Sequence, residues 1–117
     1  MLLSPSVLSV DPKLGIGSLT NRYAELAASG IAIAFKSEAE EGAGELPLLA
    51  SYAVSQGLSP DVALRALTSG AATMLRIDNR VGKLAAGLDG DVLLLDGPPL
   101  EPSTSVLRAW VAGQEVR

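Results

Sequence analysis

The feature that most constrains the fold is an unbroken run of five apolar residues, Ile31 to Phe35, which ends abruptly in the polar triplet Lys36-Ser37-Glu38. A strand with one face in water alternates apolar and polar side chains, whereas a strand covered on both faces is apolar throughout. Strands of the second kind belong to parallel sheets whose faces are packed against helices. The run therefore predicts a buried strand in an α/β fold.

The residues before this strand predict an extended segment, a loop and a helix. Leu2 to Val10 is short and extended, and Asp11-Pro12 with the glycines that follow marks a loop. Ser18 is placed to cap a helix with apolar residues at helical spacing, and Gly30 suits the left-handed conformation that ends a helix.

After the strand, a loop from Ser37 to Gly44 leads into a second helix over roughly Glu45 to Gln56. The sequence Ser59-Pro60-Asp61 combines a capping hydroxyl, a proline at the first helical position and an acid in the first turn. It predicts a third helix over about 60–69, and a further helical turn is expected at 71–75.

From there the pattern changes to short strands separated by glycine-rich turns. Strands are expected at Val81 to Leu84, Asp91 to Leu95 and Ser105 to Ala112, and Ala112-Gly113-Gln114 turns the last one back on itself. Trp110 is expected to pack on the sheet. The chain is thus predicted to have two parts, an α/β unit over 1–76 and a small antiparallel β unit over 77–117.

Composition excludes several classes of function. The 117 residues contain no cysteine and no histidine, which removes disulfides, thiolate nucleophiles and the commonest metal ligand and general base. A formal charge of -4 without a basic cluster opposes nucleic-acid binding. No signal peptide or apolar run of membrane-spanning length is present, so a cytoplasmic protein without a membrane partner is expected.

The candidate site is the polar triplet at the end of the predicted strand. In parallel α/β architectures, chemistry collects at the carboxyl ends of the strands, where Lys36, Ser37 and Glu38 lie. The alternative is that polar residues simply mark the place where a buried strand reaches solvent. The nearby glutamates lack the regular spacing of a calcium loop, so no metal site and no cofactor is assigned to this chain. The loop Ser37 to Gly44 is expected to be mobile and free of ions.

The later part of the sequence resembles the carboxyl-terminal segment of metal-dependent amidohydrolases, particularly the imidazolonepropionase-like group. That family carries a helix pattern, then a turn around a glycine, and then a closing hairpin. The corresponding residues here are Ala63-Leu64, Ala66, Thr68, Ala72, Leu75, Asn79-Arg80-Val81-Gly82, Gly87, Gly90-Asp91 and Val106 to Val116. Two departures are Ser69-Gly70-Ala71 in place of the family's Asn-Pro-Ala, and Gly90-Asp91 in place of its Ala-Asp.

The resemblance implies the last βα units of a (β/α)8 barrel followed by strands of a small β-sandwich. It also implies that the Ile31 to Phe35 strand normally presents a metal-site aspartate, so that Glu38, with Lys36 and Ser37 beside it, occupies a catalytic position. Family members use zinc or another divalent metal held by histidines from earlier strands, which this sequence lacks. The resemblance therefore implies a fragment of a hydrolase acting on C–N bonds of cyclic amides, inactive as an isolated chain.

Two other hypotheses compete with this one. The chain could be a stand-alone interaction module, or an intact small enzyme that uses Lys36 and Glu38. In either the fragment or the module, the predicted strands lack neighbours on their edges and apolar cover on their faces. We therefore expect a homo-oligomer with a largely apolar interface of at least roughly 2,000 Å².

Overall fold

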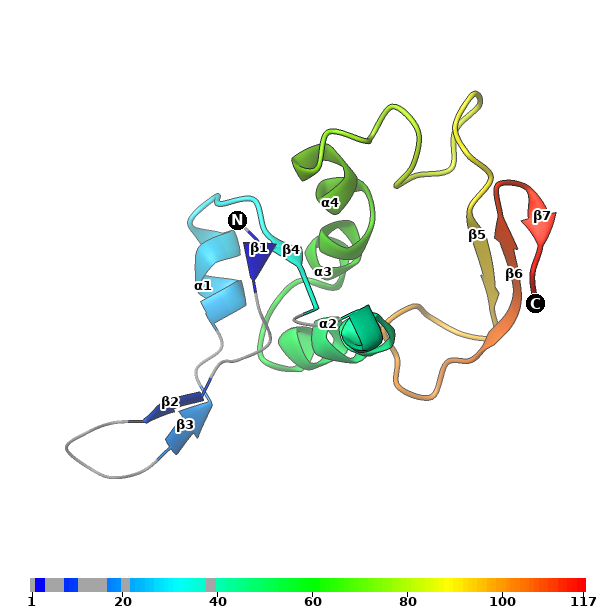
Figure 1. Ribbon diagram of the computed structural model, residues 1–117. Coiled ribbons are helices and arrows are strands. Elements are labelled where there is room, and N and C mark those ends of the chain that lie inside the picture. The colour runs from blue at the N-terminus through cyan, green and yellow to red at the C-terminus, as the bar shows by residue number, and fades with distance from the viewer. Residues whose placement is uncertain (1, 4–7, 11–16, 20–21, 38–39) are drawn as a thin grey trace.

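The computed structural model describes residues 2–3, 8–10, 17–19, 22–37 and 40–117 (Figure 1). The helices are α1 (Arg22–Ala28), the 3-10 helix η1 (Glu40–Glu45), α2 (Leu46–Ser55), α3 (Pro60–Leu67) and α4 (Ser69–Met74). The strands are β1 (Leu2–Leu3), β2 (Leu8–Val10), β3 (Gly17–Leu19), β4 (Ala34–Phe35), β5 (Val92–Leu95), β6 (Val106–Val111) and β7 (Gln114–Glu115). None of the described helices has the length and apolar character of a membrane span.

The α/β part is built around β4, which pairs in parallel with β1. Ile33 and Phe35 are each 6% exposed and the intervening Ala34 is fully buried, so side chains on both faces of the strand are covered. This confirms the prediction of a buried strand in a parallel arrangement for residues 33–35, whereas Ile31 and Ala32 are exposed. The strand is shorter than expected, because the Ile31 N–H is bonded to the Leu26 carbonyl in the stop of α1 rather than to a neighbouring strand.

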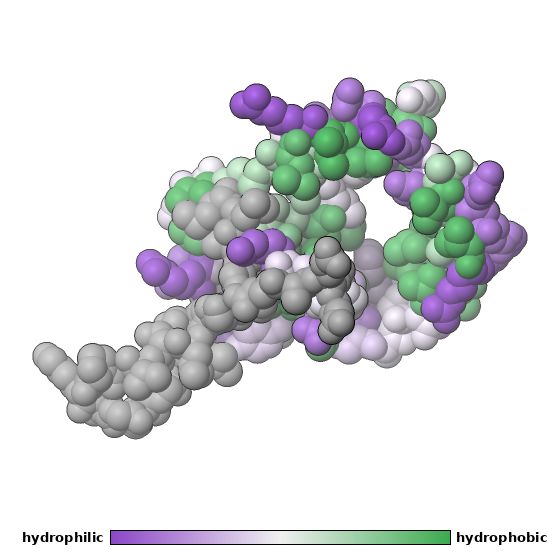
Figure 2. Space-filling view, in the orientation of Figure 1, coloured by the Kyte–Doolittle hydropathy of each residue, from purple (hydrophilic) through white to green (hydrophobic). Residues whose placement is uncertain are grey.

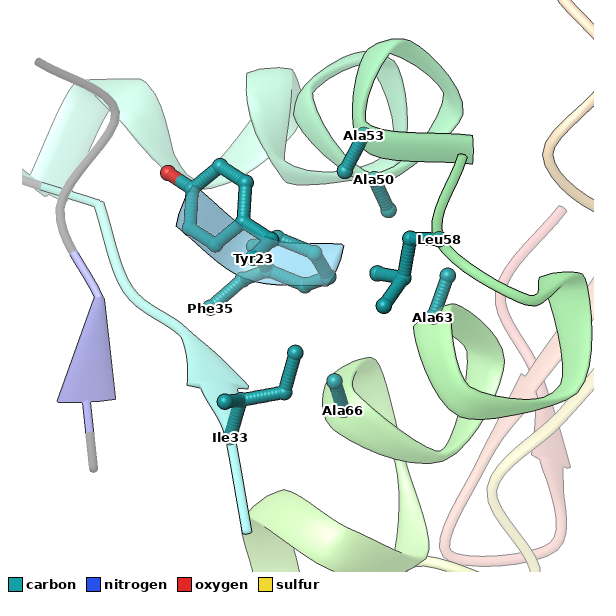
Figure 3. Close-up of a cluster of buried hydrophobic side chains, with 8 residues drawn as sticks. All are labelled: Tyr23, Ile33, Phe35, Ala50, Ala53, Leu58, Ala63 and Ala66. Carbon is teal, nitrogen blue, oxygen red and sulfur yellow. The ribbon is translucent and has the colours of Figure 1, made fainter. Parts of the chain in front are cut away.

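The core lies between β4, α1, α2 and α3 (Figure 3). Its buried members are Tyr23, Ile33, Phe35, Ala50, Ala53, Leu58, Ala63 and Ala66. The Tyr23 and Phe35 rings meet edge to face with centroids 5.2 Å apart, a favourable geometry for aromatic pairs. The small alanines on α2 and α3 let both helices approach the strand closely, and burial raises the pKa of the Tyr23 hydroxyl.

Three helices end in the same way, with a residue of positive φ and two bonds back to helical carbonyls. Gly30 has a φ of 76° after α1, which confirms the predicted helix stop, and Gly57 has a φ of 107° after α2. After α4 the position is filled by Arg76 at a φ of 60°, where the Ile77 N–H bonds the Ala72 carbonyl. A side chain at positive φ is sterically unfavourable, so the hydrogen bonds and packing around Arg76 must offset this strain.

Two predicted helix starts are wrong in detail. Ser18 does not cap a helix, because Gly17–Leu19 forms β3 and pairs antiparallel with β2, and α1 begins only at Arg22. Ser59 does occupy the N-cap of α3, with Pro60 in the first turn as predicted, but its hydroxyl makes no capping bond. Instead its main-chain carbonyl accepts the Ala63 N–H.

The predicted strand Val81 to Leu84 is also wrong, since residues 81–83 form bends and Leu84 belongs to no strand. The N–H groups of Arg80 and Val81 both bond to the Ile77 carbonyl, and Gly82 has a φ of 99° that no strand accommodates. The remaining strands form an antiparallel sheet in the order β5-β6-β7, as the sequence predicted.

This sheet stands apart from the helices and is joined to them by two segments, 75–91 and 96–105 (Figure 1). In the first segment Gly82 packs onto the junction of α3 and α4. In the second segment, two hydrogen bonds close a loop: the Asp96 N–H donates to the Ser105 carbonyl, and the Ser105 N–H donates to the Asp96 Oδ1. Within this loop, Leu100 packs against the core of the α/β part.

Gly82 provides a test of the first attachment. A methyl group at this position would lie 2.6 Å from the Ala72 side chain, whereas one at Gly87, which also has positive φ, would meet nothing. Both Gly82→Ala and Gly87→Ala incur a backbone cost of about 1–2 kcal/mol. Only Gly82→Ala adds a clash, so we expect it to lower the free energy of unfolding by about 1–3 kcal/mol more than its control. Urea denaturation measures the free energy of unfolding of both variants. Equal losses of stability would contradict the close packing of Gly82 on Ala72.

Candidate functional site

The predicted site residues lie at the carboxyl end of β4. Lys36 directly follows the strand and is exposed, and Ser37 is half-buried. Because β1 and β4 run in parallel, with Leu3 opposite Phe35, their carboxyl ends point to the same edge. Lys36 and Ser37 thus occupy the kind of edge at which α/β proteins place their chemistry. Glu38 lies outside the described residues, so its position relative to them stays a prediction.

The segment after Ser37 differs from the expected irregular loop, because residues 40–45 form the 3-10 helix η1. The backbone of Gly42 turns back over the site, and a Cβ on this residue would lie 3.4 Å from the Ser37 Cβ. Ser37 is therefore packed under the helix, while Lys36 projects into solvent.

The described residues contain no group of three or more acidic, histidine or cysteine side chains close enough to hold a metal ion. A shallow, largely apolar pocket of about 360 Å³ lies elsewhere, at the other end of β4. It is lined by Ala32, Arg65, Ser69, Gly70, Thr73 and Met74. Neither Lys36 nor Ser37 lines it, so the pocket and the candidate site are separate.

The Gly90-Asp91 pair, one of the motifs in the sequence, supports the hairpin between β6 and β7. Ala112 and Gly113 both have positive φ, at 50° and 78°, which defines a tight two-residue turn. The Asp91 Oδ1 accepts the Ala112 N–H at 2.8 Å, and the Gly90 carbonyl accepts the Gly113 N–H at 2.9 Å. The two backbones approach closely here, since a Cβ on Gly90 would lie 3.0 Å from the Gly113 nitrogen.

A second motif residue, Arg80, closes the loop that precedes the sheet. Its guanidinium Nη2 lies 2.8 Å from the Asp89 Oδ2, and its carbonyl accepts the Asp89 N–H. The two bonds join the ends of the 80–89 segment. Arg80 and Asp91 therefore hold turns in place, which is a structural role that their spacing alone did not reveal.

On the sheet itself, Arg108 links two neighbours that sequence reasoning missed. Its Nε donates to the Glu115 Oε1 at 2.7 Å, and its guanidinium carbon lies 4.9 Å from the centre of the Trp110 ring. Trp110 is half-buried in β6, in agreement with the predicted sheet-packing role. The two-residue turn at Ala112-Gly113 could have predicted this contact. A turn of this length places Trp110 directly opposite Glu115, and Arg108 is then diagonal to Glu115 across the two strands.

Comparison with known proteins identifies the class. The sequence model of the "Amidohydrolase family" matches residues 10–116, and the chain belongs to this family.

Individual relatives point the same way. The chain is 41% identical over 64 residues to adenine deaminase 2 of Jannaschia sp. (strain CCS1), covering 55% of the chain and 10% of the relative. It is 46% identical over 54 residues to the imidazolonepropionase of Rubrobacter xylanophilus, covering 45% of the chain and 13% of the relative. The chain thus spans only about a tenth of the length of these curated relatives.

The fold agrees with the family. The structure of an amidohydrolase from Thermotoga maritima MSB8 superposes with a TM-score of 0.76 at 27% identity. The superposition covers 96% of this chain and 30% of that structure. An α/β unit followed by a small antiparallel sheet is therefore a part of an amidohydrolase architecture.

The role of Asp91 can be tested with Asp91→Ala and the control Asp91→Asn, which keeps an acceptor oxygen. We expect Asp91→Ala to lower the free energy of unfolding by about 1 kcal/mol, the usual worth of one such bond, and Asp91→Asn to lower it less. Hydrogen exchange reports the bond directly: the Ala112 amide loses protection in Asp91→Ala and retains it in Asp91→Asn. Equal protection in both variants would show that the bond does not form.

The Arg108–Glu115 pair predicts a pH effect. The hydrogen bond from Arg108, reinforced by its charge, lowers the pKa of the Glu115 carboxyl below its ordinary value of 4.5. A carboxyl whose pKa is lower in the folded state contributes stability above its unfolded pKa, and loses it as the pH falls through the folded pKa. An NMR titration of Glu115 should show a low midpoint that rises in Arg108→Gln. An unchanged midpoint in the variant would show that the pair does not persist in solution.

Proposed function

We propose that the chain is the carboxyl-terminal portion of an amidohydrolase. Residues 1–76 would supply the last βα units of the (β/α)8 barrel, and residues 77–117 would supply strands of the adjoining β unit. The observation that carries the proposal is the contrast in coverage. The family model matches 10–116, almost the whole chain, while the superposition accounts for only 30% of the Thermotoga maritima structure.

The reaction proposed for the parent enzyme is metal-dependent hydrolysis of a C–N bond in a cyclic amide or a related nitrogen heterocycle. The names of the two relatives, an imidazolonepropionase and an adenine deaminase, both point to such rings. In this proposal Lys36, Ser37 and Glu38 follow β4 where the family places a metal-site carboxylate. Glu38 would act as ligand or proton acceptor, with Lys36 and Ser37 beside it.

The residues of this chain do not by themselves fit a zinc ion. Zinc that activates water is held by several convergent ligands, most often histidines, and the sequence has neither histidine nor cysteine. Within the described residues no cluster of carboxylates replaces them. We therefore propose that the isolated chain is inactive.

Inactivity is tested by metal analysis and by assay of cyclic-amide hydrolysis with the purified 117-residue chain. The expected result is zinc well below one equivalent and no turnover above the uncatalysed rate. Glu38→Gln should then change neither readout. Stoichiometric zinc together with turnover that Glu38→Gln abolishes would instead support an intact small enzyme. The fragment assignment has its own test, since the reading frame upstream of Met1 should encode a His-x-His motif.

We also propose that the isolated chain self-associates. The described residues leave large apolar side chains in water: Leu48, Leu93 and Val116 are 64%, 61% and 63% exposed. Exposed apolar side chains of this kind favour packing against further polypeptide. The observation also favours the second candidate function, a non-catalytic oligomerisation module.

A further inference from the structure

The pocket at the amino end of β4 combines groups that the proposed function does not use. It holds about 360 Å³, toward the small end of the roughly 300–1,000 Å³ that is typical of small-molecule pockets. In Figure 2 the surface around α4 is largely hydrophobic, with hydrophilic residues beside it. The lining comes from three parts of the chain: Ala32 precedes β4, Arg65 belongs to α3, and Ser69, Gly70, Thr73 and Met74 belong to α4.

One side of α4 forms much of this pocket. Ser69 and Thr73 are separated by about one helical turn, as are Gly70 and Met74, so all four lie along the same side of the helix. A Cβ on Gly70 would lie 2.8 Å from the Arg65 carbonyl oxygen, which shows how closely α4 approaches α3. Met74 is half-buried, and its unbranched side chain can adapt to apolar groups of different shape.

Arg65 supplies the charge. Among the described residues that line the pocket, it alone is ionisable. Within the described part of the chain the ion pairs join Arg80 to Asp89 and Arg108 to Glu115, and neither involves Arg65. A guanidinium presents its N–H groups in a planar fork that matches the two oxygens of a carboxylate. Arg65 is therefore available to an anion from outside the chain.

Two hydroxyls of the pocket are available as well. The hydroxyls of Ser29, Ser55 and Thr68 each donate to a main-chain carbonyl of the preceding turn. Those of Ser69 and Thr73 make no such bond with any residue that the structure describes. A hydroxyl without an internal acceptor can donate its hydrogen bond to a bound anion.

We propose that this pocket binds a small monocarboxylate with an apolar body, such as a medium-chain fatty acid. The carboxylate accepts hydrogen bonds from Arg65 and from the Ser69 and Thr73 hydroxyls, and the apolar body lies against Ala32 and Met74. A single guanidinium matches a single negative charge, whereas the second charge of a phosphate would stay uncompensated beside an apolar lining. The formal net charge of -4 gives anions no general attraction to the chain, so binding depends on this local grouping.

The test is a titration of the 117-residue chain with octanoate, followed through the backbone amide signals in NMR spectra. Octanol, which lacks the carboxylate, and acetate, which lacks the apolar body, are titrated for comparison. Arg65→Gln removes the charge from the pocket. Arg22→Gln is the matched control, because Arg22 is also an exposed helical arginine and does not line the pocket. Circular dichroism establishes that both variants are folded.

We expect octanoate to shift the amide signals of Ser69, Gly70 and Thr73 saturably, with a dissociation constant of about 1 mM, as suits a ligand of this size. Octanol and acetate should each bind at least about tenfold more weakly, because each lacks half of the recognised chemistry. Arg65→Gln should raise the octanoate constant at least about tenfold, the usual effect of losing a charge-assisted hydrogen bond. Arg22→Gln should change the constant by less than about twofold.

Three results would overturn the assignment: no saturable shift of these amides, octanol binding as tightly as octanoate, or equal weakening by the two arginine variants. The comparison of octanoate, octanol and acetate uses the unaltered chain, so it decides the question even where a variant does not fold. None of these outcomes bears on the amidohydrolase fragment proposal, which metal analysis and the upstream reading frame test separately.

Discussion

The packing of β4 against alanines is the interaction on which the rest of the molecule depends. Ile33 and Phe35 face a surface made by α2 and α3, where Ala50, Ala53, Ala63 and Ala66 present almost no side-chain bulk. This close approach buries a very short strand completely. Larger residues at the alanine positions would push the helices away and uncover the strand, since interiors at native density do not absorb added volume without strain. The position of Lys36 and Ser37 follows, because both are fixed to the end of β4.

The sheet depends on the same core, although it lies far from it in the sequence. Gly82 rests on Ala72 at the junction of α3 and α4, and Leu100 reaches the hydrophobic cluster from the 96–105 loop. Between these attachments the sheet is organised locally: Asp91 holds the Ala112-Gly113 turn, and Arg80 pairs with Asp89. The helical core and the sheet therefore form one body through two small contacts rather than through a shared layer of side chains. Such a construction leaves sheet faces free for further polypeptide.

The sequence predicted those elements whose signals are local. The continuous apolar run predicted the buried strand, and Gly30 predicted the end of α1. Pro60 predicted the start of α3, and Ala112-Gly113 predicted the closing hairpin. Each of these features depends on neighbouring residues alone. The sequence-based predictions were wrong where contacts with distant residues determine the local structure. Ser18 has a good capping side chain but is drawn into β3 by pairing with β2, and Val81 to Leu84 has strand composition but is turned by its bonds to Ile77. Lys36 and Ser37 follow β4 as the sequence predicted, whereas a role of these residues or of Glu38 in a site stays a prediction.

The motifs that reveal the family are, in this chain, residues that shape turns. Gly82 leaves room for close backbone approach, Arg80 closes a loop, and Asp91 accepts a main-chain N–H. None of these residues lies at the carboxyl end of β4. Sequence similarity in this region therefore reports that the same framework must be built, and it carries little information about the reaction. Relatives named for different substrates, adenine and imidazolonepropionate, can share this segment for that reason. In the proposed parent enzyme, the chemistry would lie at the carboxyl end of β4, at Lys36, Ser37 and Glu38.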